Sequence, residues 1–162
     1  MNSAKKLLTA VTIALACTAS VRANDDGDRF QPMQQLQGVW LSQVTIRDCP
    51  SGAALAGPFP GMISFQTGGT IGETGPALPN SMRGPGFGVW HRTGRSAFSE
   101  TLTFQRFDLS GIFLGTQVIH AMPNVANDSR SYVALGGTFE VKDQHGSTIS
   151  TGCSSATGVR FQ

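Results

Sequence analysis

The sequence contains few charged residues, few histidines and no long apolar segment. Charged side chains make up 14% of the 162 residues, and there are three histidines. Its apolar runs are too short to cross a bilayer, and its sparse basic residues do not form the footprint of a nucleic-acid-binding protein. We therefore predict neither a membrane span nor a nucleic-acid partner, and the apolar content excludes a disordered chain.

Common catalytic and metal-binding motifs are also missing. No Gly-x-Ser-x-Gly sequence marks a nucleophile, and the glycines do not open a helix as a phosphate-binding loop requires. His91, His120 and His145 do not have the spacing of metal ligands. We therefore predict no metal and no cofactor.

The first 23 residues have the pattern of a signal peptide. Lys5 and Lys6 precede an apolar stretch, Leu7–Cys17, and Val21-Arg22-Ala23 fits a signal peptidase site. We expect cleavage after Ala23, then a polar N-terminal tail over residues 24–37, and periplasmic localisation or secretion.

Removal of this leader changes the charge of the protein. The full chain has a net charge of +2, but the leader holds three basic residues and no acidic one. Nine basic and ten acidic side chains remain, a net charge of about −1. The alternative to cleavage at Ala23 is a lipoprotein anchored at Cys17.

Glycine and phenylalanine are the residues that stand out. The 20 glycines and the turn sequences between alternating segments predict an all-β chain. Eight strands are expected, at Val39–Arg47, Met62–Thr67, Thr70–Thr74, Phe87–Arg92, Phe98–Phe107, Ile112–Met122, Ser131–Lys142 and Ser147–Phe161. Eight strands joined mainly by tight turns favour a single antiparallel up-and-down β-barrel over residues 38–162. Residues 48–60 and 75–86 are expected to be irregular, and the second segment is a candidate lid.

Two cysteines remain once the leader is removed. An even number of cysteines in an exported protein favours a disulfide. Cys49 ends the first expected strand and Cys153 lies in the last, and these strands are neighbours in a closed barrel. We predict a Cys49–Cys153 disulfide; the alternative is two free thiols in the core.

Both tryptophans of the chain occur in the tripeptide Gly-Val-Trp. The first copy opens the first strand with Gly38-x-Trp40, and Arg160 lies near the end of the last strand. These residues resemble the calycin superfamily of lipocalin-like eight-stranded barrels. The resemblance implies that Trp40 closes the base of the barrel and that Arg160 packs across its ring. Trp90, in the second copy, indicates either an internal duplication or a second side chain that plugs the barrel end, and unequal spacings favour the plug.

Alternation along the strands predicts which side chains face the interior. The expected inward faces are mostly apolar and form a candidate ligand-binding surface, which consists of Ile63, Phe65, Phe98, Glu100, Leu102, Phe104, Leu114, Val118, Val133, Leu135 and Phe139.

Glu100 is the exception in this surface, because it shares its face with Phe98 and Leu102. An inward carboxyl group needs a partner, and Arg92, Arg106 or His120 are candidates. Burial raises the pKa of such a group toward the range of a general base. The alternative is that Glu100 lies in water near an open end of the barrel.

Three functions are compatible with these features. The first is a binding protein for one small apolar ligand, without catalysis. The second is a barrel cyclase or isomerase that uses Glu100 as acid and base, with His120 as a possible helper. The third is a structural or interaction module whose phenylalanines fill the core. The sequence does not predict the oligomeric state.

Overall fold

The computed structural model describes residues 35–76 and 81–162. All regular secondary structure in these two segments is β-strand, and they include no helix with the length and apolarity to cross a membrane. The strands are β1 Gly38–Arg47, β2 Ala54–Phe65, β3 Thr70–Thr74, β4 Met82–Arg83, β5 Gly86–Arg92, β6 Phe98–Phe107, β7 Phe113–Ala121, β8 Pro123–Val125, β9 Ser131–Lys142 and β10 Thr148–Arg160. The expected signal peptide and most of the expected tail lie outside the described residues.

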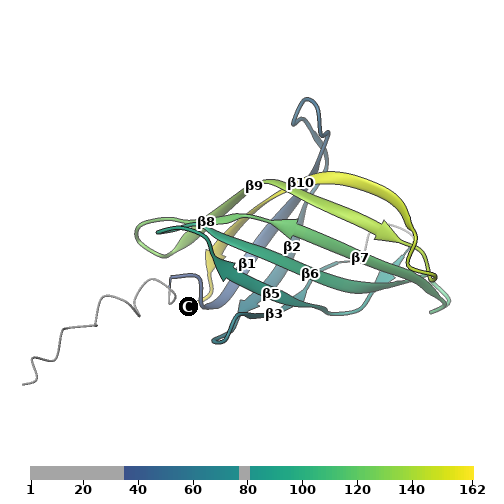
Figure 1. Cartoon of the computed structure of the whole chain (residues 1–162), viewed down its shortest axis with the longest axis horizontal. Helices are drawn as coiled ribbons and strands as arrows, with labels where there is room; N and C mark the ends of the chain where they lie inside the picture. Colours follow the sequence, from purple (N-terminus) through teal and green to yellow (C-terminus); the bar gives the residue numbers. More distant parts are fainter. Residues whose placement is uncertain (1–34, 77–80) are drawn as a thin grey trace, which may run out of the picture.

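Eight of these strands form one closed antiparallel barrel (Figure 1). The order around it is β1-β2-β3-β5-β6-β7-β9-β10, and pairing between β1 and β10 closes the ring. The short β4 pairs with β6, and the short β8 pairs with β9. Since neighbours in the chain are neighbours in the sheet, the predicted up-and-down barrel is confirmed.

All eight expected strands are present, but two expected loops contain strand. The second strand begins at Ala54, so much of residues 48–60 belongs to the hairpin of β1 and β2, whose turn projects beyond the barrel in Figure 1. The candidate lid at residues 75–86 contains β4, and its residues 77–80 lie outside the described part. Short strands flanked by glycine and proline give too little alternation to be recognised in a sequence.

Aromatic rings close one end of the barrel interior. Trp40 contacts Tyr132, with ring centroids 5.2 Å apart, and edge contacts continue from Tyr132 to Phe65, Trp90 and Phe98. Both indole N–H groups donate to main-chain oxygens, at 2.8 and 3.1 Å. Each edge-to-face pair contributes about 0.5–1.5 kcal/mol beyond its buried area. We call these five rings the aromatic plug; it contains both tryptophans of the repeated tripeptide.

Arg160 covers the outer side of the plug. Its guanidinium carbon lies 4.3 Å from the centroid of a Trp40 ring, as the calycin resemblance implies. The same guanidinium donates to the main-chain oxygens of Gln35, Gln37 and Ser129. Gly38 has a φ of +122°, and a Cβ there would lie 2.7 Å from Arg160 Nη1, which explains the glycine of the first Gly-Val-Trp.

The predicted inward face of β7 is wrong. Gln117, Ile119 and Ala121 face the interior, so the alternate positions Leu114, Val118 and His120 face outward. The outward set contains Leu114 and Val118, whereas the inward positions combine a glycine, an amide and an alanine with Ile119. An amphipathicity argument therefore selects the wrong face when a barrel exposes apolar groups.

The predicted face of β9 is right for one half of the strand and wrong for the other. Between Ala134 and Gly137, β9 holds one more residue than β10 does, and Gly136 has a φ of +75°. This bulge reverses the alternation, so Phe139 points inward as predicted whereas Val133 and Leu135 are exposed.

The predicted disulfide is present. Cys49 and Cys153 are bonded, their Cα atoms are 5.2 Å apart and they are separated by 104 residues. The bond connects the end of the β1–β2 hairpin to β10, next to the pairing of Arg47 with Cys153. Constraint of so long a loop in the unfolded chain corresponds to about 4–5 kcal/mol of stabilisation.

Substitution of Arg160 tests whether the plug depends on its cover. We expect Arg160→Met to lower the free energy of unfolding by about 2–4 kcal/mol, because it removes the cation–π contact and leaves main-chain oxygens without donors. Arg95→Met, at an exposed arginine, should change it by less than about 0.5 kcal/mol. Urea unfolding followed by tryptophan fluorescence measures both, and equal effects of the two substitutions would contradict this role.

Candidate functional site

A cavity of about 350 Å³ lies inside the barrel. Its walls come from β1, β2, β6, β7, β9 and β10, with contributions from β3 and β4. Apolar side chains dominate and include Val44, Ile46, Phe59, Ile63, Leu102, Phe104, Ile119, Phe139 and Val141. A volume of this size is at the lower end of the range for small-molecule sites.

The predicted ligand-binding residues divide into three groups. Ile63, Glu100, Leu102, Phe104 and Phe139 line the cavity. Phe65 and Phe98 are buried in the aromatic plug and do not line it.

The remaining predicted residues lie on the outside of the barrel. Leu114, Val133 and Leu135 are exposed and Val118 is half-buried, because of the face of β7 and the bulge in β9. Their predicted inward orientation is therefore corrected. His120 is also exposed, where its Nδ1 lies 3.0 Å from Thr101 Oγ1, so it does not approach Glu100.

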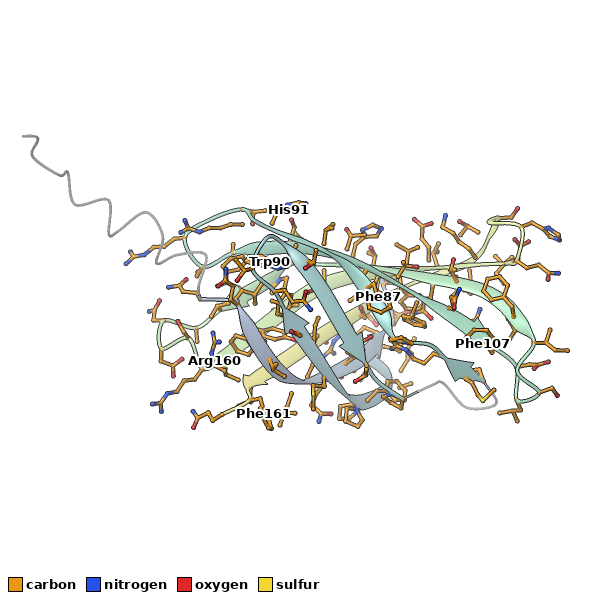
Figure 2. All side chains as sticks on the ribbon, turned by 90° about the horizontal axis from the view of Figure 1, so that it is seen from below. Phe87, Trp90, His91, Phe107, Arg160 and Phe161 are labelled. Carbon is orange, nitrogen blue, oxygen red and sulfur yellow. A yellow bond between two sulfur atoms is a disulfide. The ribbon has the colours of Figure 1, made fainter. Side chains whose placement is uncertain are left out.

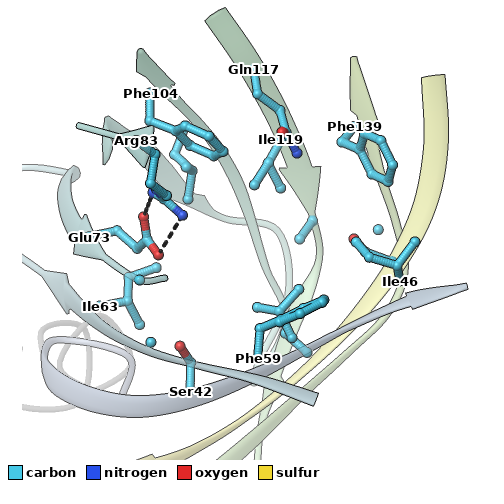
Figure 3. A pocket seen from close by; sticks show the side chains of 18 of the residues that line it. Ser42, Ile46, Phe59, Ile63, Glu73, Arg83, Phe104, Gln117, Ile119 and Phe139 are labelled. Carbon is cyan, nitrogen blue, oxygen red and sulfur yellow. Dashed lines mark hydrogen bonds and ion pairs between the residues drawn. The ribbon is translucent and has the colours of Figure 1, made fainter. Parts of the chain in front are cut away.

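An ion pair between Glu73 and Arg83 is part of the cavity wall (Figure 3). The guanidinium of Arg83 contacts both carboxylate oxygens, and its carbon lies 3.6 Å from the centroid of the Phe104 ring. Burial raises the pKa of Glu73 above its ordinary value, and the charge of Arg83 opposes this shift. In Figure 3, Ser42 and Phe59 lie on the wall that faces Arg83 across the cavity.

Glu100 is the most perturbed acid in the cavity. Its side chain is 9% exposed, and its Oε2 atom is buried without a hydrogen-bond partner in the described residues. Burial raises the pKa of Glu100 to about 7, and the nearby charge of Glu73 adds to the shift. The alternative position in water is therefore excluded. Arg92 is exposed and donates to a main-chain oxygen, so it does not pair with Glu100 as expected.

Tyr132 connects the cavity to the plug. Its ring contacts Trp40 and Phe65, and its hydroxyl is hydrogen-bonded to Ser42. Burial, and next the charge of Glu100, raise the pKa of Tyr132, so its hydroxyl stays protonated as a potential donor. Glu100, Tyr132 and Ser42 thus add polar groups to a cavity wall that also holds the Glu73–Arg83 ion pair.

Sequence reasoning missed several cavity residues for different reasons. Alternation in Thr70–Thr74 places Ile71 and Glu73 on one face, so the signal for Glu73 was available. Arg83 follows a loop rich in proline and glycine, where no periodicity indicates direction. Gln117 and Ser42 are polar residues on inward faces, which an apolar pattern does not find.

The described residues contain no group of three or more histidine, cysteine, aspartate or glutamate side chains suited to a metal ion. The polar atoms of the cavity instead belong to carboxyl, hydroxyl, amide and guanidinium groups. These groups are able to orient a ligand by hydrogen bonds and to exchange protons with it.

Comparison with known proteins identifies the fold of the chain but no family. No family model and no curated protein matches the chain. The solved structure of EF1p2_mFAP2b bound to DFHBI matches with a TM-score of 0.50 and 18% sequence identity, over 80% of this chain and 97% of that one. The chain is therefore an all-β, closed eight-stranded antiparallel barrel similar to that structure.

The raised pKa of Glu100 predicts how stability depends on pH. The folded protein keeps the Glu100 proton up to about pH 7, whereas the unfolded chain releases it near its ordinary value of 4.5. The folded state therefore loses stability as pH rises between these values, by about 3 kcal/mol in total. We expect Glu100→Gln to match the natural protein at pH 5 and to be more stable at pH 8.

Urea unfolding at both pH values measures this difference. In Glu100→Gln, the free energy of unfolding should still fall as pH rises, but by less, because the pKa of Glu73 is also raised in the fold. The matched control is Glu140→Gln, because the Glu140 carboxylate lies outside the cavity and pairs with Lys142. A Glu100→Gln protein with the same pH dependence as the natural one would show that Glu100 is already ionised in the fold.

Proposed function

We propose that this chain is an exported, calycin-related protein that binds one small apolar ligand inside its barrel. The observation that carries the proposal is the cavity of about 350 Å³ with mainly apolar walls. The phenylalanines do not fill the interior, so the expectation of a packed core is wrong. An unfilled apolar cavity forfeits packing energy, and a ligand restores those contacts.

The kinship to calycins is supported by the closed end of the barrel. Arg160 packs across the ring of Trp40, as the resemblance implies, and Gly38 leaves room for the guanidinium. Export is supported by the leader-like sequence and by the Cys49–Cys153 disulfide, since such bonds persist in oxidising compartments. The similar solved barrel is described as bound to DFHBI, which is consistent with a small-molecule site in this architecture.

A dye titration tests ligand binding directly. The protein from Asn24 onward should bind the neutral, environment-sensitive dye Nile red with one saturable site, followed by dye and tryptophan fluorescence. Ala156→Phe adds a ring to the cavity wall and should weaken binding at least about tenfold, because it removes the space for the dye.

The matched control is the neighbouring residue. Thr157→Phe places the same ring on the exposed outer face and should leave dye affinity unchanged. Absence of saturable binding by the folded protein, or equal weakening by both substitutions, would contradict an internal site.

A second function, acid–base catalysis by Glu100, is favoured by one specific observation. Oε2 of Glu100 is buried and unpartnered in the described residues, and burial raises the pKa of this group to about 7. A carboxyl group with this pKa exchanges protons near neutral pH and suits an isomerase or cyclase acting on an apolar substrate.

Comparison of two proteins on the same substrates tests this function. Apolar extracts of the source cells are incubated with the natural protein and with Glu100→Gln, and compounds are followed by mass spectrometry and chromatography. Catalysis predicts a compound that the natural protein converts, and that Glu100→Gln binds with similar affinity but converts at least about a hundredfold more slowly. Equal conversion by both proteins, or no conversion, would leave binding as the sole function.

A further inference from the structure

Two arginines lie directly opposite one another at the cavity. Arg83 of β4 pairs with Arg106 of β6 in the antiparallel register, and both side chains line the cavity. Like charges at directly opposed positions of a sheet destabilise it unless an anion lies between them. Glu73 neutralises Arg83, whereas within the described residues the guanidinium of Arg106 has no ion pair and no hydrogen bond.

The charges of the cavity do not balance. Its ionisable groups are Glu73, Glu100, Arg83, Arg106 and Tyr132, and the raised pKa of Tyr132 keeps that hydroxyl neutral. Glu100 is largely neutral below about pH 7, because burial disfavours its charged form. One negative charge then faces two positive ones, and the excess positive charge belongs to Arg106.

Arg106 and Glu100 mark two separate regions of the cavity. They share the inward face of β6 but are six residues apart, about 20 Å along the strand. In Figure 2, Phe107, the neighbour of Arg106, lies far along the barrel from Trp90 and Arg160. Leu102 and Phe104 form the β6 wall between the two polar positions.

From this arrangement we propose that the ligand is an elongated apolar monocarboxylic acid and that Arg106 binds its carboxylate. The proposal rests on the proposed binding function and specifies its ligand class. A guanidinium donates two parallel hydrogen bonds to a carboxylate, and the apolar chain then extends along Phe104 and Leu102 toward Glu100.

The charge balance favours a carboxylate over a phosphate. A carboxylate carries one negative charge and neutralises the one unpaired guanidinium. A phosphate monoester carries about −1.5 to −2 near neutral pH and would bring excess negative charge close to Glu73. A carboxylic acid and a phosphate of the same chain length should therefore bind with different affinities, and one experiment compares them.

Displacement of Nile red by four ligands of matched chain tests the proposal. The ligands are oleic acid, its methyl ester, oleyl alcohol and oleyl phosphate, each measured below its aggregation limit at about pH 6, where Glu100 keeps its proton. We expect oleic acid to bind about tenfold to a hundredfold more tightly than the methyl ester and the alcohol, because only the acid forms charge-assisted hydrogen bonds.

Arg106→Gln should remove this preference. Its affinity for oleic acid should fall about tenfold to a hundredfold, while its affinity for the methyl ester should change less than about twofold. Arg106→Lys keeps the charge and should retain part of the preference. Arg95→Gln is the matched control at an exposed arginine, and thermal unfolding verifies that each variant is folded.

The other outcomes separate the two proposals. Equal binding of acid, ester and alcohol, or an Arg106→Gln protein that still prefers the acid, overturns the carboxylate site and leaves the binding function standing. Tighter binding of oleyl phosphate than of oleic acid overturns the assignment to a carboxylate. Absence of binding by all four ligands and by the dye overturns the binding function itself.

Discussion

The pairing of β1 with β10 is the constraint on which the remaining structure depends. This pairing extends from Trp40 with Arg160 to Arg47 with Cys153, and it converts a sheet with two open edges into a closed barrel. Closure brings the first and last strands together, and only then do the cation–π contact at one end and the disulfide near the other become possible. Both connect chain segments more than a hundred residues apart, so they stabilise the same closure.

Eight strands also determine how much space the barrel encloses. The aromatic plug occupies the interior at one end, and residues with smaller side chains such as Gly137, Ala134 and Ala156 leave the cavity beyond it. Charged groups that are buried in the cavity wall are expensive, because they lose their hydration. Glu73 is compensated by Arg83, but Glu100 is not compensated within the described residues, and its carboxyl group responds by holding its proton. A buried carboxyl group without a partner lowers the stability of the fold, and such a group in a cavity wall is typical of a functional site.

Much of the fold was predictable from local features of the sequence. Turn sequences of aspartate and glycine separated the strands, and the even number of cysteines identified the disulfide. The face of β6 was also predictable, because Phe98, Leu102 and Phe104 alternate without interruption, and this alternation placed Glu100 inside.

The remaining site residues depend on interactions that a single strand does not reveal. The bulge at Gly136 reverses the alternation of β9, and nothing in the composition of that strand fixes its position. On β7, the apolar outer positions carried a stronger signal than Gln117 and Ala121, whose inward direction is set by pairing with β6 and β9. Arg83 enters the cavity through a two-residue strand that only the pairing with β6 defines. The charge balance of the cavity was therefore visible only in three dimensions.

The most direct test of the account is native mass spectrometry of the protein purified from its own source without added lipid. The account predicts a non-covalent complex with one ligand per chain, whose released ligand has the mass and negative-ion spectrum of an apolar monocarboxylic acid. The Ala156→Phe protein purified in the same way should lack it. A natural protein that carries no ligand, and that takes up no oleic acid when the acid is supplied, would contradict the claim that the barrel is a binding site.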